Sequence, residues 1–407
     1  MAFEQFGHAD VAAWSRAVAE FMARHEGLRS ELLIGGHSQV SSRLDYDPDV
    51  RIRTEEHDLT GDTGAWRDRL EAIIGYACRP TSWPASWFGV IDRGGSSTFI
   101  AAFDRSLVDE VSLLTALRDL HALYLVHVRP SSGRAPLPEV GSFLDAAVEE
   151  QAAPFDPDSM EACYWHDFLE RFDATVPRSG FETGLRPGQE ATLATSEHLL
   201  VTPGQLSWLT ASLGRRASAP TVMLAAAAMA HRRAGTASGL TTMLQVDTRR
   251  LPEWEQAMGW FDTVVPLEIE AAATLRETLP RADLAWMLAE SMSWVSVARV
   301  LSAVPLPVRW PSGDLNTVAW HDLRARPGND LVDLTSAVLL EQQATTDEVQ
   351  LAFTRTRRGV FVRCRRPDTP EAHDSFERWL AELELIVGDG PETAASRPRI
   401  DSSCPQG

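Results

Sequence analysis

Apolar and polar positions follow two different periods along this chain. Between residues 9 and 24, Val11, Trp14, Val18, Phe21 and Met22 recur at helical spacing with polar residues between them, which predicts an amphipathic helix. The same period predicts further helices at 63–79, 107–128, 161–172, 202–216, 221–234, 275–294 and 375–389. Helices therefore account for much of both halves of the chain.

Short apolar runs bounded by turn residues predict the strands. Residues 87–104 contain two such runs around Gly94 and Gly95, and the second run is continuously apolar, which is typical of a buried strand. In the second half, strands are predicted at 240–248, 264–270, 316–323, 336–343, 348–356 and 359–365. Each half thus combines strands with helices, which predicts two α/β lobes at 1–175 and 176–390. The segment 173–190 is the expected link, and residues 391–407 are expected to be a disordered tail.

Composition narrows the class of protein. A chain of 407 residues exceeds the usual size of one domain, and a 44% hydrophobic content lets each lobe bury a core. No long uncharged apolar span and no signal-peptide pattern occur, so we expect a cytoplasmic protein that does not enter a membrane. With a formal charge of -19, the chain lacks the net positive charge with which proteins bind nucleic-acid phosphates, so nucleic acid is not an expected partner.

The basic residues and the cysteines exclude several chemistries. All 38 basic residues are arginines, so Schiff-base lysines and phosphate-binding loop lysines are absent. The four cysteines are scattered without a CxxC pair, which favours reduced thiols and predicts no metal site.

Five short fragments carry a family resemblance, and they occur in this order: RHEGLR (24–29), DRSLVDEVSLL (104–114), YWHDFL (164–169), GWFDTVVPL (259–267) and SAVPLP (302–307). They resemble the RHExLR, HHxxxDGxS, YxDF, GxFVNT and QDxPFE elements of the condensation-domain superfamily of nonribosomal peptide synthetases. The opening element of that family, with its SxxQ motif, is absent here. Either the start is late or part of the acceptor-side wall is missing.

The resemblance implies an α/β (α+β, two-layer) fold. Two chloramphenicol-acetyltransferase-like lobes would form a V-shaped pseudo-dimer with a central tunnel. Substrates on phosphopantetheine arms enter that tunnel, and an acyl thioester is joined to an amine or alcohol without a bound cofactor. The expected partner is an acyl or peptidyl carrier protein.

The motif positions depart from the family at its two histidines, where Asp104 and Arg105 stand. An arginine stays protonated and cannot accept the nucleophile's proton, so Arg105 either holds an anion or forms a buried ion pair that plugs the tunnel. Glu110 and Asp104 are the expected carboxylates for such a plug. Asp104 would serve as a base only if burial raised its pKa.

Other positions take their expected roles from the same resemblance. Asp109 matches the invariant acid, whose role is a structural salt bridge, and Arg29 is its expected partner. Glu110 replaces a glycine and is expected to change the local backbone. Three further residues are expected to face the tunnel: Trp260, Asp262 and Thr263. His121 is expected to be a satisfied surface or core histidine, and His166 and Asp167 are expected to serve packing.

Two functions remain open at this point. The pattern DRxxxDE partly resembles the HRxxxDD motif of X-type condensation domains, which bind cytochrome P450 enzymes and form no peptide bond. The chain is therefore either an atypical acyltransferase that acts in trans on carrier-bound thioesters, or a non-catalytic protein that recruits a tailoring enzyme such as a P450.

Overall fold

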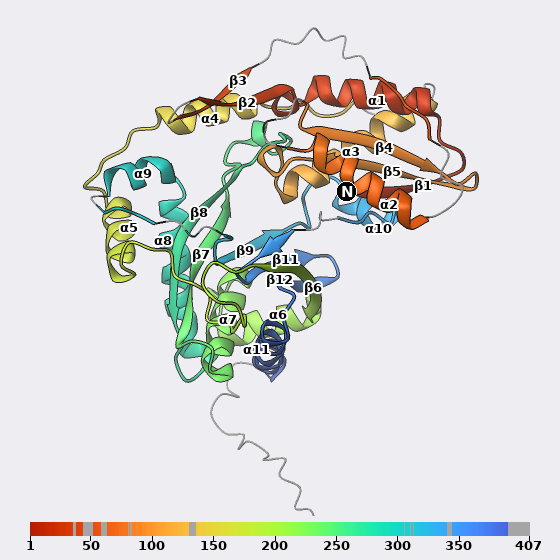
Figure 1. Cartoon of the computed structure of the whole chain (residues 1–407). Coiled ribbons are helices and arrows are strands. Elements are labelled where there is room, and N and C mark those ends of the chain that lie inside the picture. Colours follow the sequence, from red (N-terminus) through yellow and green to blue (C-terminus); the bar gives the residue numbers. More distant parts are fainter. Residues whose placement is uncertain are drawn as a thin grey trace, which may run out of the picture. The chain divides into compact units, whose positions relative to one another are not determined.

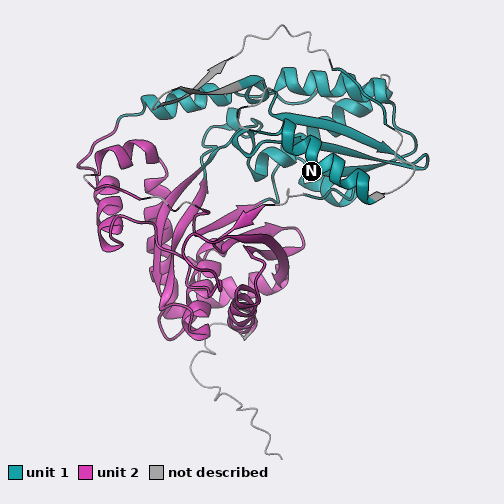
Figure 2. Cartoon of the chain, in the orientation of Figure 1, with its two compact units in different colours: residues 1–154, 247–262, 323–342 teal, residues 155–246, 263–322, 343–407 magenta. Residues whose placement is uncertain are grey.

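The chain folds into two compact units (Figures 1 and 2). The computed structural model describes residues 1–35, 38–43, 52–57, 63–79, 81, 84–129, 136–304, 306–309, 311, 313–339 and 344–389. Unit 1 comprises Met1–Pro154, Asp247–Asp262 and Leu323–Gln342. Unit 2 comprises Phe155–Val246, Thr263–Asp322 and Gln343–Gly407.

This division differs from the expected lobes at 1–175 and 176–390 in two respects. The first is that the chain passes to unit 2 after Pro154, so the expected link at 173–190 lies inside unit 2. The reason is that Trp165 and Phe168 are fully buried in the core of unit 2. The second is that two segments of the second half return to unit 1. The expected disordered tail, 391–407, lies outside the described residues.

Unit 1 is built on a three-stranded antiparallel sheet in the order β1-β5-β4. Its strands are β1 (Ala2–Phe6), β2 (Ser30–Gly35), β3 (Ser38–Arg43), β4 (Ser86–Asp92) and β5 (Ser96–Phe103), of which β2 and β3 pair separately. Its helices are α1 (Val11–Arg24), α2 (Thr63–Ala77), α3 (Glu110–Val128), α4 (Phe143–Ala152) and α10 (Asn329–Leu334), with 3-10 turns at Glu26–Arg29, Arg105–Leu107 and Pro252–Trp254. Apolar faces of α1 and α3 meet the sheet around Phe3, Phe21 and Phe99, which are completely buried.

Unit 2 is built on a seven-stranded mixed sheet in the order β10-β6-β12-β11-β9-β7-β8. Its strands are β6 (Ala191–Val201), β7 (Gly239–Asp247), β8 (Asp262–Glu270), β9 (Thr317–Asp322), β10 (Thr345–Thr346), β11 (Gln350–Thr356) and β12 (Gly359–Pro367). Its helices are α5 (Met160–Arg171), α6 (Pro203–Leu213), α7 (Ala219–Ala234), α8 (Leu275–Met292), α9 (Val297–Ala303) and α11 (Pro370–Asp389). Strand β9 runs parallel to both β11 and β7.

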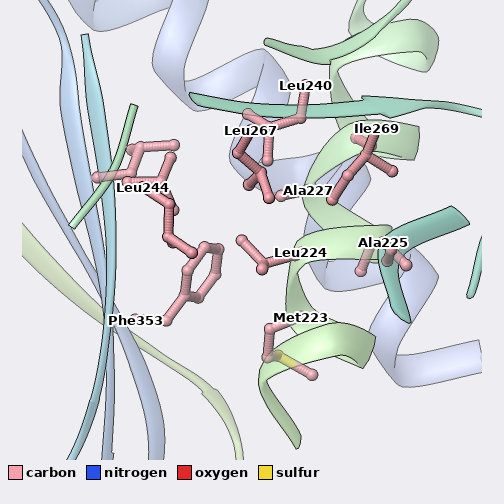
Figure 3. Packing of buried hydrophobic residues seen from close by; sticks show 14 of the residues in the cluster. Met223, Leu224, Ala225, Ala227, Leu240, Leu244, Leu267, Ile269 and Phe353 are labelled. Carbon is pink, nitrogen blue, oxygen red and sulfur yellow. The ribbon is translucent and has the colours of Figure 1, made fainter. Parts of the chain in front are cut away.

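Helix α7 lies at the centre of the core of unit 2. It is apolar all round, as expected for a helix buried on every side, and it packs against α8 and α11. Figure 3 shows Leu224 of α7 pointing toward Leu244 of β7 and Phe353 of β11. The core around α7 therefore consists largely of apolar side chains.

Most helices lie where the hydrophobic period predicts them, and local capping fixes their starts. Thr202 and Gln205 form a reciprocal capping box with Pro203 at the first helical position of α6, as the sequence indicates. One strand prediction is wrong. Residues 336–339 of the expected strand 336–343 lie outside the strands, although Val338 forms an isolated antiparallel bridge with Ala2. The remainder, 340–343, is outside the described residues.

One described helix, α3, is long and apolar enough to cross a membrane by length and composition alone. Leu117, Asp119 and Leu120 of that helix are buried within unit 1, which is typical of a core helix. Three cysteines, Cys78, Cys163 and Cys364, are free thiols, and Cys404 lies outside the described residues.

Candidate functional site

The candidate site is built around the start of α3, where the DRxxxDE segment turns from strand β5 into the helix. Asp109 is the N-cap of α3, and its Oδ1 accepts a hydrogen bond from the backbone N–H of Ser112 at 2.8 Å. Its Oδ2 accepts a second from the backbone N–H of Phe261 at 2.9 Å. The side chain of Asp109 is only 1% exposed. The carboxylate thus joins the motif to the returning segment 247–262 of unit 1.

Arg249 neutralises this buried carboxylate. Its guanidinium binds Asp109 in a bidentate manner, with Nη1 at 2.7 Å from Oδ2 and Nη2 at 2.8 Å from Oδ1. The same guanidinium lies 4.3 Å from the ring centroid of Phe261 and within 3.3 Å of Asp247. Arg326 pairs with the other oxygen of Asp247. An alternating chain of charges, Arg326–Asp247–Arg249–Asp109, therefore ties both returning segments to the start of α3.

The expected partner of Asp109 was wrong. Asp109 is buried and ion-paired as expected, but its partner is Arg249 and not Arg29. The reason is geometric: all four hydrogen-bonding positions of the carboxylate are taken by Arg249 and by the N–H groups of Ser112 and Phe261. Arg29 lies in the 3-10 turn that precedes β2, and its buried Nε has no hydrogen-bond partner.

Ser112, in the first turn of α3, also binds the returning segment 247–262. Its hydroxyl donates to the carbonyl of Gly259 at 3.0 Å and accepts from the N–H of Gly259 at 3.1 Å and from Arg249 at 3.0 Å. A Cβ at Gly259 would stand 2.2 Å from the ring of Phe143, so only glycine permits this close approach. The glycine of the GWFDTVVPL fragment therefore serves packing against α3 and α4.

A second buried node joins the RHEGLR fragment to the middle of α3. Asp119 Oδ2 accepts from Arg24 Nε at 2.8 Å and pairs with His25 Nε2 at 2.9 Å, and Oδ1 pairs with Arg118 at 2.6 Å. Burial lowers the pKa of His25 more than the hydrogen bond to Asp119 raises it. Burial alone would raise the pKa of Asp119, but the bond from His25 and the two arginines bring it below the ordinary value. This node is a structural clamp between α1 and α3.

Arg105 occupies the position of the family's second histidine and does not form the expected plug. It is exposed, and no described residue forms an ion pair or a hydrogen bond with its guanidinium. Asp104, one candidate partner, caps the 3-10 turn Arg105–Leu107 by accepting from the N–H and hydroxyl of Ser106. Glu110, the other candidate, begins α3 with an ordinary helical backbone, so the expected change of geometry does not occur. Arg105 is thus available to a ligand.

No nearby group that the structure describes replaces the missing imidazole. Cys78 is close enough to Asp104 to feel its charge, and burial together with that charge raises the pKa of the thiol to about 11. The thiol is therefore protonated at neutral pH and a weak nucleophile. His121 lies on α3 with its ring 6.4 Å from that of Phe3, which fits the satisfied histidine expected there.

The remaining expected residues are placed as follows. Trp260 is 38% exposed, and Asp262 and Thr263 are half-buried, so all three are at least partly accessible; their role in lining a tunnel stays a prediction. His166 is half-buried and Asp167 is exposed, and their packing role stays a prediction. With Glu170 they bring three possible metal ligands within 4.8 Å of one another on the surface of α5. Exposed carboxylates gather in this way without an ion, so the cluster alone defines no site.

The sequence reasoning missed Arg249, Ser112 and Asp119. Arg249 follows a strand in a segment (VDTRRL) that carries no recognisable spacing to Asp109, 140 residues earlier. The sequence gives a weak indication for Asp119. It is an acidic residue on the apolar helix predicted at 107–128, and a buried carboxylate needs a partner. Ser112 stands at the serine of the HHxxxDGxS pattern but has no chemistry that would single it out.

The fold is that of the condensation-domain superfamily. A solved structure described as the PapA2 acyl transferase superposes with a TM-score of 0.82 at 21% identity, covering 95% of this chain and 85% of that one. The X-domain from teicoplanin biosynthesis superposes with a TM-score of 0.71 at 18% identity, covering 98% of this chain and 92% of that one. The first condensation domain of the calcium-dependent antibiotic synthetase gives 0.67 at 17% identity, covering 95% and 91%. The resemblance stated from the sequence is thereby confirmed at the level of the fold.

Sequence comparison finds proteins that are named as acyltransferases. The chain is 24% identical over 403 residues to the acyltransferase PapA3 of Mycobacterium tuberculosis, covering 94% of this chain and 81% of that protein. It is 22% identical over 402 residues to the trehalose-2-sulfate acyltransferase PapA2 of the same organism, covering 93% and 81%. No family model matches the chain. Its similar proteins are thus acyltransferases and condensation domains of natural product biosynthesis.

Proposed function

We propose that this chain binds acyl or peptidyl thioesters presented in trans by a carrier protein, and that it does so without histidine-dependent condensation. One observation carries the proposal. The frame of the motif is complete, with Asp109 buried and bidentately paired to Arg249, whereas the position of the base holds the exposed and unpaired Arg105. The buried pair thus fixes the start of α3, next to the turn that carries Arg105.

The chemistry of Arg105 suits binding rather than proton transfer. A guanidinium donates up to five hydrogen bonds in a fixed fork and stays protonated throughout the physiological range. It matches the phosphate of a phosphopantetheine arm or a carboxylate of the acyl group. A protein that holds such a thioester without converting it can present it to a tailoring enzyme such as a cytochrome P450. A solved X-domain similar in fold to this chain is in complex with OxyB.

A second candidate is acyl transfer in which Arg105 holds the oxyanion. The observation in its favour is that the similar proteins PapA3 and PapA2 are named acyltransferases. Their chemistry would need a group other than Asp104 or Arg105 to accept the proton of the alcohol or amine. Arg105 is a cation and cannot do so, and Asp104 Oδ1 is already engaged as the cap of the 3-10 turn.

Removal of the guanidinium tests the proposal. A carrier protein loaded with an acyl-phosphopantetheine arm is titrated against the parent, and Arg105→Ala is expected to weaken binding about 10- to 100-fold, since a hydrogen bond to a charged group contributes about 1.5–3 kcal/mol. Arg16→Ala is the matched control, because Arg16 is an exposed arginine on α1 of the same unit. Calorimetry measures both. A parent that binds loaded and unloaded carriers equally well would contradict the proposal.

A further inference from the structure

Helix α8 of unit 2 has two apolar faces. The inner face packs in the core with the following buried residues: Leu275, Thr278, Leu279, Ala282, Ala285, Ala289 and Met292. On the outer face, Leu284 is 53% exposed and Met287 is 58% exposed. Trp294, seven residues past Met287 and just beyond the helix end, is 64% exposed. The interval of three residues places Leu284 and Met287 on one face of α8, and Trp294 follows where the helix ends.

Helix α5 adds a fourth exposed apolar side chain. The hydroxyl of Ser291 on α8 donates to Glu161 Oε1 at 2.6 Å, which fixes the first turn of α5 beside the last turn of α8. Met160, the first residue of α5, is 61% exposed. We call Met160, Leu284, Met287 and Trp294 the α5–α8 patch. Four large apolar side chains, each more than half exposed, lie within two adjoining helices, whereas singly scattered exposed apolar residues are ordinary.

Acidic side chains lie beside the α5–α8 patch. Glu161 and Glu290 lie on the same turns as the apolar residues, and Asp158 lies just before α5. No described residue forms an ion pair with any of these three carboxylates. The nearest arginine along α8, Arg281, is already paired with Glu270 at 2.9 Å. On α5 and α8 the patch is therefore bordered by three carboxylates that have no ion-pair partner among the described residues.

We infer that the α5–α8 patch docks a partner protein whose own face is apolar with an arginine- or lysine-rich rim. An apolar centre inside a charged rim is the usual anatomy of a transient interface, and Met and Trp are enriched in such centres. Complementary charge steers the encounter and excludes other partners. A second copy of this chain fits poorly, because it would bring the same acidic rim and a formal charge of -19 against itself. The inference adds a docking surface to the proposed recruitment role. It rests on that role for the function of the partner, but not for the existence of the surface.

A synthetic probe tests the patch itself. A fluorescein-labelled amphipathic helical peptide of leucine and lysine is titrated against the parent, and its anisotropy is recorded at low and high salt. The double variant Leu284→Ser with Met287→Ser is expected to weaken binding at least about tenfold, since each change removes a buried apolar contact at the centre of the interface. Glu161→Gln with Glu290→Gln is expected to lower affinity at low salt only. Leu385→Ser is the matched control, because Leu385 is 46% exposed on α11 of the same unit.

The possible results distinguish a partner protein on the patch from a second copy of this chain and from nonspecific binding of the peptide. Protection from hydrogen exchange at 158–171 and 283–294 on adding the peptide, lost in the double serine variant, supports the inference. Equal binding by the double serine variant and the Leu385→Ser control would overturn it, as would a parent that elutes as a dimer dissociated by Met287→Ser. Binding of carriers through Arg105 is measured without the peptide, so a failure of the patch leaves the proposed function standing and the reverse also holds.

Discussion

Asp109→Ala is expected to lower the free energy of unfolding by about 3–5 kcal/mol, because it leaves the guanidinium of Arg249 buried without its carboxylate. The loss is large because Asp109 also caps α3 and holds the N–H of Phe261. The same substitution therefore frees the start of the helix and the returning segment 247–262 together. Urea or thermal unfolding of purified parent and variant measures the difference.

Two further variants show whether the effect belongs to the pair. Asp104→Ala removes a cap of the same chemical type from an accessible 3-10 turn and is expected to cost about 0.5–2 kcal/mol. Arg249→Met in the Asp109→Ala background is expected to recover part of the loss, since it removes a buried guanidinium whose remaining partner is Asp247 at 3.3 Å. If Asp109→Ala unfolded at the same denaturant concentration as Asp104→Ala, the buried pair would not be the anchor described here.

Acidification is expected to destabilise the protein through its buried histidines. Burial lowers the pKa of His231, in the core of unit 2, from 6.5 to about 4, and it also lowers the pKa of His25. Both gain a proton more readily when unfolded than when folded, so the stability that they contribute is present above pH 6.5 and is lost as the pH falls below it. For His231 alone the loss between pH 6.5 and about 5 is roughly 2 kcal/mol.

Replacement of the imidazole isolates this contribution. His231 packs between Phe181 and Trp379, so His231→Phe preserves aromatic contact and cannot titrate. Its free energy of unfolding is expected to change by roughly 2 kcal/mol less than that of the parent over the same pH interval. A His231→Phe variant with the parent's full acid dependence would show that His231 does not titrate as described.

The sequence predicted the elements well where the signal is local. The helix at 9–24, the capped start of α6 and the turn at Gly94–Gly95 each follow from residues a few positions apart, and all three are present. The burial of Asp109 was also predictable, because the motif resemblance marks it. Its partner was not, because Arg249 comes from a segment 140 residues later whose return to unit 1 leaves no local pattern.

The two errors about 336–343 and Arg105 have a common cause. Residues 336–343 have a strand composition, yet Val338 bonds to Ala2 at the edge of unit 1, so tertiary context decided its structure. Arg105 was expected to seek a carboxylate, but Asp104 is held by Ser106 and Glu110 begins α3. In both cases the hydrogen-bond partners depend on how the backbone brings distant or neighbouring segments together, and the residue types alone do not predict this.

The central claim is that Arg105 marks a binding site without ordinary condensation chemistry, and intact mass spectrometry of the carrier tests it most directly. The purified protein is mixed with an acyl-loaded carrier and with simple amines or alcohols, and the mass of the carrier is followed with time. The acyl group is expected to stay on the carrier at the background rate with the parent, because Arg105 cannot accept the proton of the amine or alcohol. Acyl transfer by the parent above background, lost in Arg105→Ala, would contradict the account and make this chain an acyltransferase in which Arg105 holds the oxyanion.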